Sequence, residues 1–220
     1  MRKIIVATFV SLDGVMQAPG GPEEDPTGGF RFGGWVAPHF DEASGAAMDE
    51  IFSRPYDLLL GRKTYDIFAA HWPFAEGGPD APIAEAFNRI DKYVASRSKR
   101  DLTWNNSHWL GEDTVGALKK LKAGDGPDLL VQGSSNLLQT LWKHRLVDEF
   151  NVLVFPVLLG KGKRLFGDEV APAGLKLVKS QSYPTGVIVT KYVPDGEVKT
   201  GSFALAEPSE AELERRKNLS

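Results

Sequence analysis

Along most of the chain, short apolar runs alternate with stretches in which apolar residues recur at helical spacing. Residues 3–9 form the first apolar run, which is typical of a buried strand and ends at Asp13-Gly14. Further strands are predicted at residues 57–60, 92–96, 103–108, 128–132 and 149–159. Helices are predicted at residues 41–52 and 62–70, from Pro82, from Asp113 or Thr114 to Gly124, and around residues 137–142. Strands that alternate with helices favour a mostly parallel sheet, so the pattern predicts an α/β fold.

The end of the chain departs from this alternation. The last two predicted strands, near residues 175–180 and 186–193, have no helix between them, which favours antiparallel pairing there. From Pro194 the composition becomes polar, and Ser209-Glu210-Ala211-Glu212 has the form of a capping box at a helix start. We therefore predict one domain, residues 1–193, and a polar C-terminal tail, residues 194–220, that serves as a surface appendage or a dimer arm.

A long loop rich in glycine and proline, residues 17–34, follows the first strand. Loops of more than about 12–15 residues within a compact domain are often functional lids and are otherwise disordered. Because this loop leaves the end of a buried strand, we interpret it as a lid over a site.

Composition narrows the classes of protein that the pattern allows. The 220 residues include no cysteine, which excludes disulfides, thiolate metal sites and a cysteine nucleophile. Lys and Arg total 26 against 29 Asp and Glu, so the net charge of −3 argues against a dedicated nucleic-acid binder. No apolar stretch approaches the ~18–20 residues of a membrane helix, and no signal-peptide cleavage site follows the first strand. We therefore expect a cytoplasmic protein with no nucleic-acid or membrane partner and, because the four histidines lack metal-binding spacing, no metal site.

Groups suited to binding anions recur where a predicted strand gives way to a polar turn or a helix. They are Gly61, Arg62, Lys63 and Thr64 after the second strand, Ser96 and Arg97 after the third, and Gly133, Ser134 and Ser135 after the fifth. Backbone N–H groups at a helix start, with cationic and hydroxyl side chains, are suited to phosphate. Each turn by itself is also explained as an ordinary polar turn or a helix cap, and neither standard nucleotide-binding glycine motif is present. Since α/β sheets bind ligands at the carboxyl ends of their strands, the three turns together predict an extended cofactor with several phosphates.

Two further residues are candidates for contact with a substrate. Asp13 ends the first strand, where a carboxylate could hydrogen-bond a heterocycle or orient a proton-bearing water. An Asp-Gly turn explains the same residue without a functional role. Trp35 follows two glycines and could cover a ring-shaped ligand or pack in the core. Asp13 is therefore a candidate catalytic and substrate-binding residue, and Trp35 a candidate substrate-binding residue.

Five segments in order carry a resemblance to a known family. They are Ser11-Leu12-Asp13-Gly14, Leu60-Gly61-Arg62-Lys63-Thr64-Tyr65, Val94-Ala95-Ser96-Arg97, Val131-Gln132-Gly133-Ser134, and the segment from Asp148-Glu149 through Pro156-Val157-Leu158-Leu159-Gly160-Lys161-Gly162-Lys163-Arg164-Leu165-Phe166. On these motifs the chain resembles the dihydrofolate reductase-like superfamily, specifically the reductase domain of bacterial riboflavin biosynthesis and its stand-alone relatives. The resemblance covers residues 1–193 and implies a three-layer α/β/α domain.

The resemblance implies NADPH as the cofactor, bound across the carboxyl edge of the sheet. It places residues 62–64 near the adenosine phosphates and residues 96–97 at the 2′-phosphate, and it assigns the pyrophosphate to residues 133–135. Gly61, before the first of these segments, is also a predicted cofactor-binding residue. A preference for the 2′-phosphate agrees with the cations in these turns, because a free ribose diol is usually recognised by an acidic residue.

The resemblance also implies an activity, namely hydride transfer from NADPH to a small heterocyclic substrate, as in 5-amino-6-(5-phosphoribosylamino)uracil reductase. Dihydrofolate reductase and a non-catalytic NADP(H)-binding module are the alternatives. The acidic residue with which true dihydrofolate reductases engage the pterin has no clear match in residues 41–52. The missing cysteines exclude the zinc deaminase domain that the riboflavin enzymes often carry. The family and the long final strands favour a homodimer.

Overall fold

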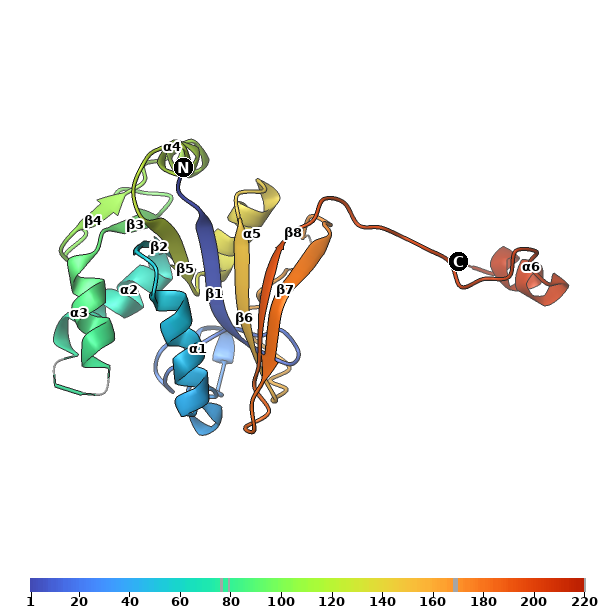
Figure 1. The fold of residues 1–220 in the computed structure, drawn as a ribbon, viewed down its shortest axis with the longest axis horizontal. Coiled ribbons are helices and arrows are strands. Elements are labelled where there is room, and N and C mark those ends of the chain that lie inside the picture. The colour runs from blue at the N-terminus through green and yellow to red at the C-terminus, as the bar shows by residue number, and fades with distance from the viewer. Residues whose placement is uncertain (76, 79, 168–169, 220) are drawn as a thin grey trace.

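An eight-stranded sheet forms the centre of the protein in a computed structural model (Figure 1). The structure describes residues 1–75, 77–78, 80–167 and 170–219. The strands are β1 (Ile4–Ser11), β2 (Tyr56–Gly61), β3 (Lys92–Ala95), β4 (Ser107–Trp109), β5 (Asp128–Gln132), β6 (Glu149–Phe155), β7 (Leu175–Ser182) and β8 (Ile188–Pro194). Their order across the sheet is β4-β3-β2-β5-β1-β6-β8-β7.

The pairing is parallel from β4 across to β6 and antiparallel at the C-terminal edge. Strand β8 runs antiparallel to β6, and β7 runs antiparallel to β8. The predicted mixed, mostly parallel sheet with antiparallel C-terminal strands is therefore confirmed. Ala7 in β1 pairs with Gln132, the last residue of β5, whereas pairing with β6 continues as far as Ser11. The second half of β1 is consequently unpaired on its β5 side, and this gap becomes the floor of a cavity.

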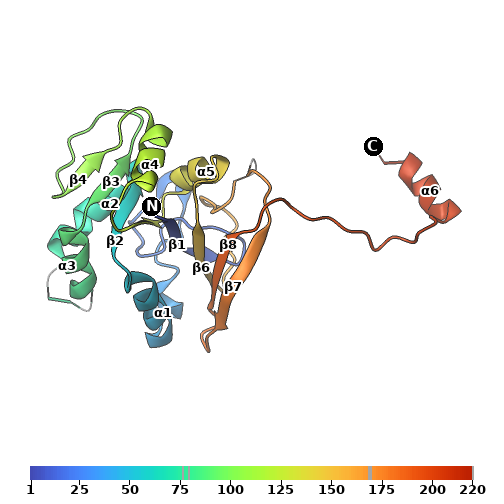
Figure 2. The ribbon, with the colours of Figure 1, turned by 45° about the horizontal axis from the view of Figure 1, so that its top comes forward.

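Helices cover both faces of the sheet, which confirms the predicted three-layer α/β/α arrangement (Figures 1 and 2). They are α1 (Glu42–Phe52), α2 (Arg62–His71), α3 (Ala81–Arg89), α4 (Thr114–Ala123) and α5 (Ser135–Lys143), while α6 (Glu210–Lys217) lies in the tail. Because side chains alternate along a strand, Ile4 and Val6 of β1 pack with α4 and α5. Ile5 and Ala7 pack on the opposite face, towards α1.

The predicted helix starts are explained by their caps. The Asp41 carboxylate accepts a hydrogen bond of 2.8 Å from the Ser44 N–H at the start of α1. Asp113, one of the two residues at which the sequence predicts the start of α4, accepts from the Gly116 N–H at 2.9 Å. These side chains satisfy backbone donors that a helix leaves unpaired in its first turn, so they mark where each helix begins.

Two predicted strands are shorter in the structure by more than one residue. The fourth begins only at Ser107, because the Trp104 N–H donates to the Tyr65 hydroxyl at 3.0 Å instead of to a neighbouring strand. The sixth ends at Phe155 rather than at residue 159, since Pro156 has no N–H to continue the ladder. Residues 157–165 instead contact the turn that follows β1, through backbone bonds such as Met16 N–H to Lys163 C=O at 2.8 Å.

The C-terminal edge and the tail differ from the rest of the domain. All residues of β7 are exposed, and β7 is one of the two edge strands of the sheet. The chain then leaves the domain, and α6 lies apart from the sheet in both views (Figures 1 and 2). Ser209 caps α6 by accepting from the Glu212 N–H, as the capping box predicts. The domain boundary after residue 193 and the homodimer stay predictions, and Ser220, the last residue of the predicted tail, lies outside the described residues.

No helix in the described part of the chain combines the length and the apolar character needed to cross a membrane.

Candidate functional site

A cavity of about 1150 Å³ opens at the carboxyl ends of the parallel strands. Residues 61–64, 95–98 and 132–137 form one side, here called the strand-end wall. Residues 16–25 together with Lys163 form the other side, here called the loop wall. Residues 7–9 of β1 lie between the walls, and after Ala7 the strand β5 no longer pairs with β1. Ligand cavities in proteins are usually about 300–1,000 Å³, so this one has room for an extended ligand or for two ligands side by side.

The strand-end wall brings together all nine residues that the sequence predicts for cofactor binding. Gly61, Arg62, Lys63, Thr64, Ser96, Arg97, Gly133, Ser134 and Ser135 all line the cavity. They converge because β2, β3 and β5 are parallel and end at the same edge of the sheet. Both α2 and α5 begin there, so the unpaired N–H groups and the positive dipole ends of two helices lie at this wall.

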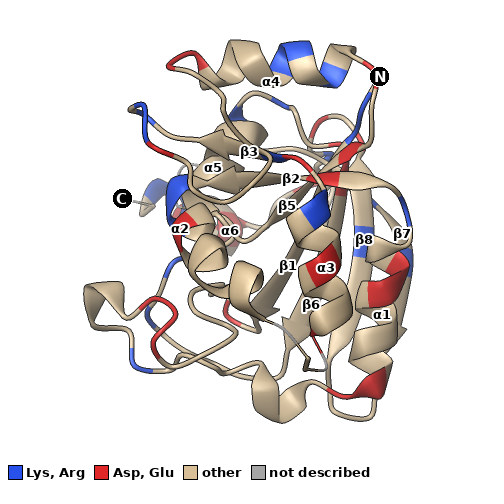
Figure 3. Cartoon of the chain, turned by 90° about the vertical axis from the view of Figure 1, so that its left-hand side faces the viewer, with Lys and Arg blue, Asp and Glu red and all other residues tan. Residues whose placement is uncertain are grey.

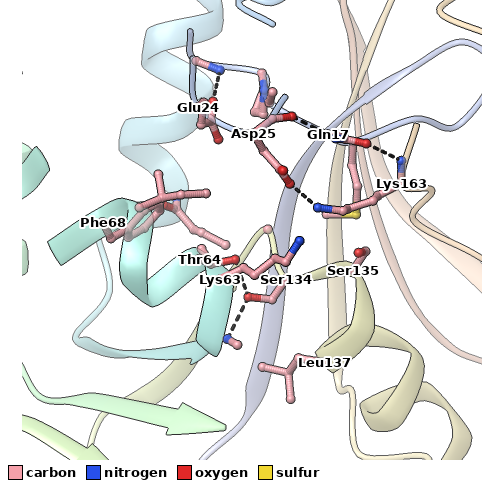
Figure 4. Close-up of a pocket in the computed structure, with 18 of the residues that line it drawn as sticks. Gln17, Glu24, Asp25, Lys63, Thr64, Phe68, Ser134, Ser135, Leu137 and Lys163 are labelled. Carbon is pink, nitrogen blue, oxygen red and sulfur yellow. Dashed lines mark hydrogen bonds and ion pairs between the residues drawn. The ribbon is translucent and has the colours of Figure 1, made fainter. Parts of the chain in front are cut away.

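Ser134 holds two parts of this wall together (Figure 4). Its hydroxyl accepts from the Gly61 N–H at 2.8 Å and donates to the Thr64 hydroxyl at 2.7 Å. It makes no side-chain bond as N-cap of α5, and its φ of 66° is in the left-handed region. Ser134 therefore connects the start of α2 to the start of α5, instead of capping its own helix.

Gly61 is required by this contact and not by its backbone angles. Its φ of −74° and ψ of 158° are open to any residue. A Cβ at this position, however, would lie 3.0 Å from the Ser134 hydroxyl oxygen and 3.1 Å from the Ser134 Cβ. The close approach at this glycine is thus between two turns of the protein itself.

The cations of the strand-end wall are exposed to the cavity mouth. Arg62 forms an ion pair of 3.2 Å with Asp66, which Arg100 also contacts at 3.0 Å (Figure 3 marks the charged positions along α2). Exposed pairs of this kind contribute little free energy, so they leave the Arg62 guanidinium available to a bound anion. Arg97 is exposed and lines the same cavity.

The loop wall is held in place by one buried amide. The Gln17 side chain is 5% exposed. Its nitrogen donates to the Asp25 and Thr27 carbonyls at 2.8 and 2.9 Å, and its oxygen accepts from the Lys163 N–H at 3.0 Å. The first half of the predicted loop at residues 17–34, namely residues 17–25, therefore forms a wall of the cavity, and movement of the loop as a lid stays a prediction.

Trp35 lies behind this wall rather than in the cavity. Its indole N–H donates to the Gln17 carbonyl at 2.8 Å, and its ring packs edge-on against Phe155 at 5.5 Å between centroids. It is 7% exposed and is absent from the residues that line the cavity. These contacts match the packing interpretation of Trp35.

Asp13 is also outside the lining of the cavity. Its carboxylate accepts from the Ser11 hydroxyl at 2.6 Å and from the Leu159 and Gly160 N–H groups at 3.1 and 2.8 Å. Burial opposes ionisation of Asp13, but these hydrogen bonds outweigh burial and hold its pKa below the ordinary value. The side chain thus fastens the turn after β1 to the segment that carries Lys163.

A half-buried carboxyl, Glu24, faces the cavity from the loop wall (Figure 4). Its Oε2 accepts from the Gly20 and Gly21 N–H groups at 2.6 and 3.3 Å. Burial raises the pKa of Glu24 above its ordinary value in spite of these two bonds. A carboxyl in such surroundings takes up a proton more readily than an exposed one, which suits it to acid–base chemistry.

A charged cluster joins the two walls. Lys163 Nζ forms an ion pair with Asp25 and lies 3.1 Å from the Thr27 hydroxyl, while Lys63 Nζ lies 3.5 Å from the same hydroxyl. The hydrogen bond and positive charge of Lys163 lower the pKa of Lys63. Burial would raise the pKa of Asp25, but the hydrogen bonds from Lys163 and Thr27 outweigh it and keep the pKa low.

The sequence interpretation missed most of the loop wall. It did not single out Gln17, Glu24 or Asp25, and it explained Lys163 as part of a basic turn. The acidic stretch Glu23-Glu24-Asp25 inside a Gly/Pro loop was a signal of a site, but nothing in the spacing showed that Lys163 lies beside it. Within the described residues, no group of three or more His, Cys, Asp or Glu is placed to hold a metal ion.

Comparison with known proteins identifies the family. Residues 2–189 match the model of the RibD C-terminal domain. The chain belongs to this family. The RibD C-terminal domain thus covers nearly all of the predicted domain, and the resemblance drawn from the motifs is confirmed.

One curated relative and two solved structures are similar to this chain. The uncharacterized protein YyaP of Bacillus subtilis (strain 168) is 28% identical over 197 residues, which cover 87% of this chain and 94% of YyaP. Among solved structures, a putative riboflavin biosynthesis protein from Shewanella sp. PV-4 has a TM-score of 0.60 at 21% identity, covering 89% of this chain and 99% of that one. Dihydrofolate reductase from Enterococcus faecalis in complex with NADP(H) has a TM-score of 0.54 at 11% identity, covering 88% and 96%. The two structures establish a shared dihydrofolate reductase-like fold.

Proposed function

We propose that this RibD C-terminal domain protein is an NADPH-dependent reductase that transfers a hydride to a small heterocyclic substrate. The observation that carries the proposal is the strand-end wall, where two helix N-termini, the cations of two turns and the hydroxyls of a third meet at one cavity. Such a wall suits a ligand with several phosphates. The NADP(H) complex of the Enterococcus reductase, which shares the fold, supports the choice of cofactor.

Different residues of the strand-end wall would bind different parts of the cofactor. Ser135 and the N-terminal N–H groups of α5 would hold the pyrophosphate, with Thr64 nearby. Arg62 and Arg97 would take the 2′-phosphate, for which a guanidinium has matching geometry. Ser134 keeps these groups at a fixed separation through its bonds to Gly61 and Thr64. Bound NADPH supplies the hydride, so the protein supplies position and electrostatics.

The remaining part of the cavity suits a flat, partly apolar substrate. Side chains of β1, α1 and α2 line it with apolar surface, among them Phe9, Met48 and Phe68. These groups exclude water from the place where a hydride would move. Reduction of a C=N or C=O bond also requires a proton, and we assign Glu24 as its donor, because Glu24 is a carboxyl that faces the cavity and has a raised pKa.

This arrangement favours a riboflavin-type pyrimidine substrate over dihydrofolate. Met48 is the one residue of α1 among those that line the cavity, and the acidic positions of α1, red in Figure 3, are absent from the lining. The acidic group available to a substrate therefore comes from the loop wall. The reaction of 5-amino-6-(5-phosphoribosylamino)uracil reductase is the nearest specific activity, in agreement with the riboflavin biosynthesis protein of the same fold.

The first experiment is a titration with NADPH and with NADH. Trp72 lines the cavity, so quenching of tryptophan fluorescence reports binding. We expect NADPH to bind at least about tenfold more tightly than NADH, because guanidinium–phosphate bonds of about 1.5–3 kcal/mol are absent for NADH. Replacing Arg97 by Ala should weaken NADPH and leave NADH unchanged. Equal affinity for the two cofactors, or no binding, would contradict the proposal.

Turnover is then tested with NADPH-saturated protein. Loss of absorbance at 340 nm with an aminopyrimidine substrate, and not with dihydrofolate, is the expected result. Cofactor binding without turnover of pyrimidines, pterins or simple carbonyls would instead favour the non-catalytic NADP(H)-binding module.

A further inference from the structure

Two ammonium groups, from opposite walls of the cavity, approach one hydroxyl. Lys63 lies in the first turn of α2 and Lys163 in the turn after β6, and both line the cavity. Their Nζ atoms lie 3.5 and 3.1 Å from the Thr27 Oγ1. That hydroxyl donates its proton to the Asp25 Oδ1 at 2.5 Å, so towards the lysines it acts as an acceptor. The two cations therefore lie beside one shared acceptor. Figure 4 shows the side chains of Lys63 and Lys163, which reach into the cavity from its two sides.

The charge of this cluster is not balanced by its carboxylate. Asp25 contributes one negative charge against the two ammonium groups. Arg62 also lies near Lys63, but it is paired with Asp66 at 3.2 Å and is left out of this count. The Asp25 side chain is only 13% exposed and is already engaged by Lys163 and Thr27. The neighbouring Glu24 accepts from the Gly20 and Gly21 N–H groups, away from the lysines. An anion entering the cavity at this place would offset the remaining positive charge.

We infer that Lys63 and Lys163 form an anion subsite that binds a phosphate or carboxylate group, with Asp25 occupying Lys163 until the ligand displaces it. The subsite rests on the proposed function in one respect, since the anion is carried either by the cofactor or by the substrate of that reaction. Because Lys63 belongs to the strand-end wall and Lys163 to the loop wall, an anion bound by both lysines joins the two walls. It thereby closes the cavity around a ligand that carries such a group.

The subsite also predicts a proton linkage. The groups that act on Lys63 are Lys163 and Arg62, which lower its pKa, and Asp25, which raises it. A bound anion favours the charged form, so it raises the pKa of Lys63 and increases the number of protons held in the complex. Sulfate, whose own charge is constant in this range, should consequently bind more weakly as the pH rises through the pKa of Lys63.

The experiment is a calorimetric titration of the full chain with inorganic phosphate and with ribose 5-phosphate, at constant ionic strength. Lys163→Met should weaken both ligands about tenfold, the effect of removing one charge-assisted hydrogen bond. Lys161→Met is the matched control, because Lys161 is an exposed lysine of the same turn that does not line the cavity, and it should change nothing. Lys163→Arg should retain most of the affinity, and thermal unfolding checks that each variant is folded.

Asp25→Asn provides a test in the opposite direction. Removing the internal competitor should tighten phosphate binding several-fold, whereas a merely structural Asp25 predicts no change or a loss. Equal affinities of Lys163→Met and Lys161→Met, no tightening in Asp25→Asn, or no saturable phosphate binding by the unaltered protein would each overturn the inference.

Two arms distinguish the source of the anion. If phosphate binding persists with saturating NADP⁺ present, the subsite serves the substrate; if NADP⁺ abolishes it, the subsite serves a phosphate of the cofactor. The fluorescence titration with NADPH is run on the same samples. Tight NADPH binding without the phosphate effects rejects the subsite alone, and phosphate effects without NADPH binding reject the proposed function alone.

Discussion

The two walls of the cavity are built in different ways. The strand-end wall consists of turns that directly follow β2, β3 and β5, so backbone pairing in the sheet places them. The loop wall is placed by side chains, and its principal contacts join residues far apart in the chain. Gln17 and Lys163 are 146 positions apart, and Asp25 and Lys163 are 138 positions apart.

This difference indicates that the two walls have different roles in binding. A wall fixed by helices and a sheet holds its groups at constant positions, as a dinucleotide with several phosphates requires. A wall held by a few side-chain contacts changes readily through substitution, and binding specificity often resides in such loops. We therefore expect the cofactor to depend on the strand-end wall and the choice of substrate on the loop wall.

The strongest test of this comparison is Gly61→Val. The new side chain would overlap Ser134, which lies 3.0 Å from the position of a Cβ, and would push α2 and α5 apart. Overpacking costs about 1–3 kcal/mol, so NADPH affinity should fall at least about tenfold and thermal stability should fall with it. Gly45→Ala in α1 is the control, because its Cβ would meet only Phe40 at 3.9 Å. Unchanged NADPH affinity in Gly61→Val would show that the turns are not coupled.

A smaller effect is expected from removing one hydroxyl. Ser134→Ala loses the bonds to Gly61 and Thr64, each worth about 1 kcal/mol, and should lower both the unfolding free energy and NADPH affinity. Ser135→Ala, next in the chain, should lower NADPH affinity and leave stability unchanged, because Ser135 is assigned to the ligand. Denaturant unfolding and fluorescence titration measure the two quantities. If both variants lose stability equally, the distinction between these serines is wrong.

Asp13→Asn separates the candidate catalytic role from the position seen in the structure. The low pKa of Asp13 means that its hydrogen bonds stabilise the protein above the ordinary pKa and that this contribution is lost as the pH falls through the lowered value. At neutral pH the variant should therefore be about 1 kcal/mol less stable, with a difference that disappears in acid, and NADPH affinity should be unchanged. Loss of turnover at unchanged stability would instead make Asp13 a catalytic residue.

The smallest change in stability is expected from Glu24→Gln. Because burial raises the pKa of Glu24, the folded state binds a proton at Glu24 more tightly than the unfolded state does. The stability that this bound proton contributes is lost as the pH rises through the raised pKa. Glu24→Gln should consequently gain stability relative to the unaltered protein as the pH rises from the ordinary pKa of a glutamate through the raised pKa of Glu24, while turnover falls and NADPH affinity stays the same. Glu23→Gln, at an exposed neighbour, is the control. Full turnover in Glu24→Gln would remove Glu24 as the proton donor.

Local rules account for the parts of the fold that could be predicted. The strand at residues 128–132 coincides with β5, and Asp41 and Asp113 cap α1 and α4 as their positions predict. The last strand before the antiparallel pair was predicted too long, because the apolar run continues past Pro156 although the ladder does not. Apolar character continues through that boundary, whereas the missing N–H of one residue ends the strand.

The residues of the candidate site likewise fall into those that local sequence predicts and those that only the tertiary structure places. The sequence by itself determined the alternation of strands and helices and the nine residues of the strand-end turns, because periodicity, caps and turns depend on neighbours in the chain. Only the tertiary structure decided that Asp13 fastens a turn, that Trp35 packs behind the wall, and that Gln17, Asp25 and Lys163 meet. Those contacts depend on β1 and β6 lying side by side in a particular register, which brings together residues more than a hundred positions apart. No local pattern in the sequence encodes these long-range contacts.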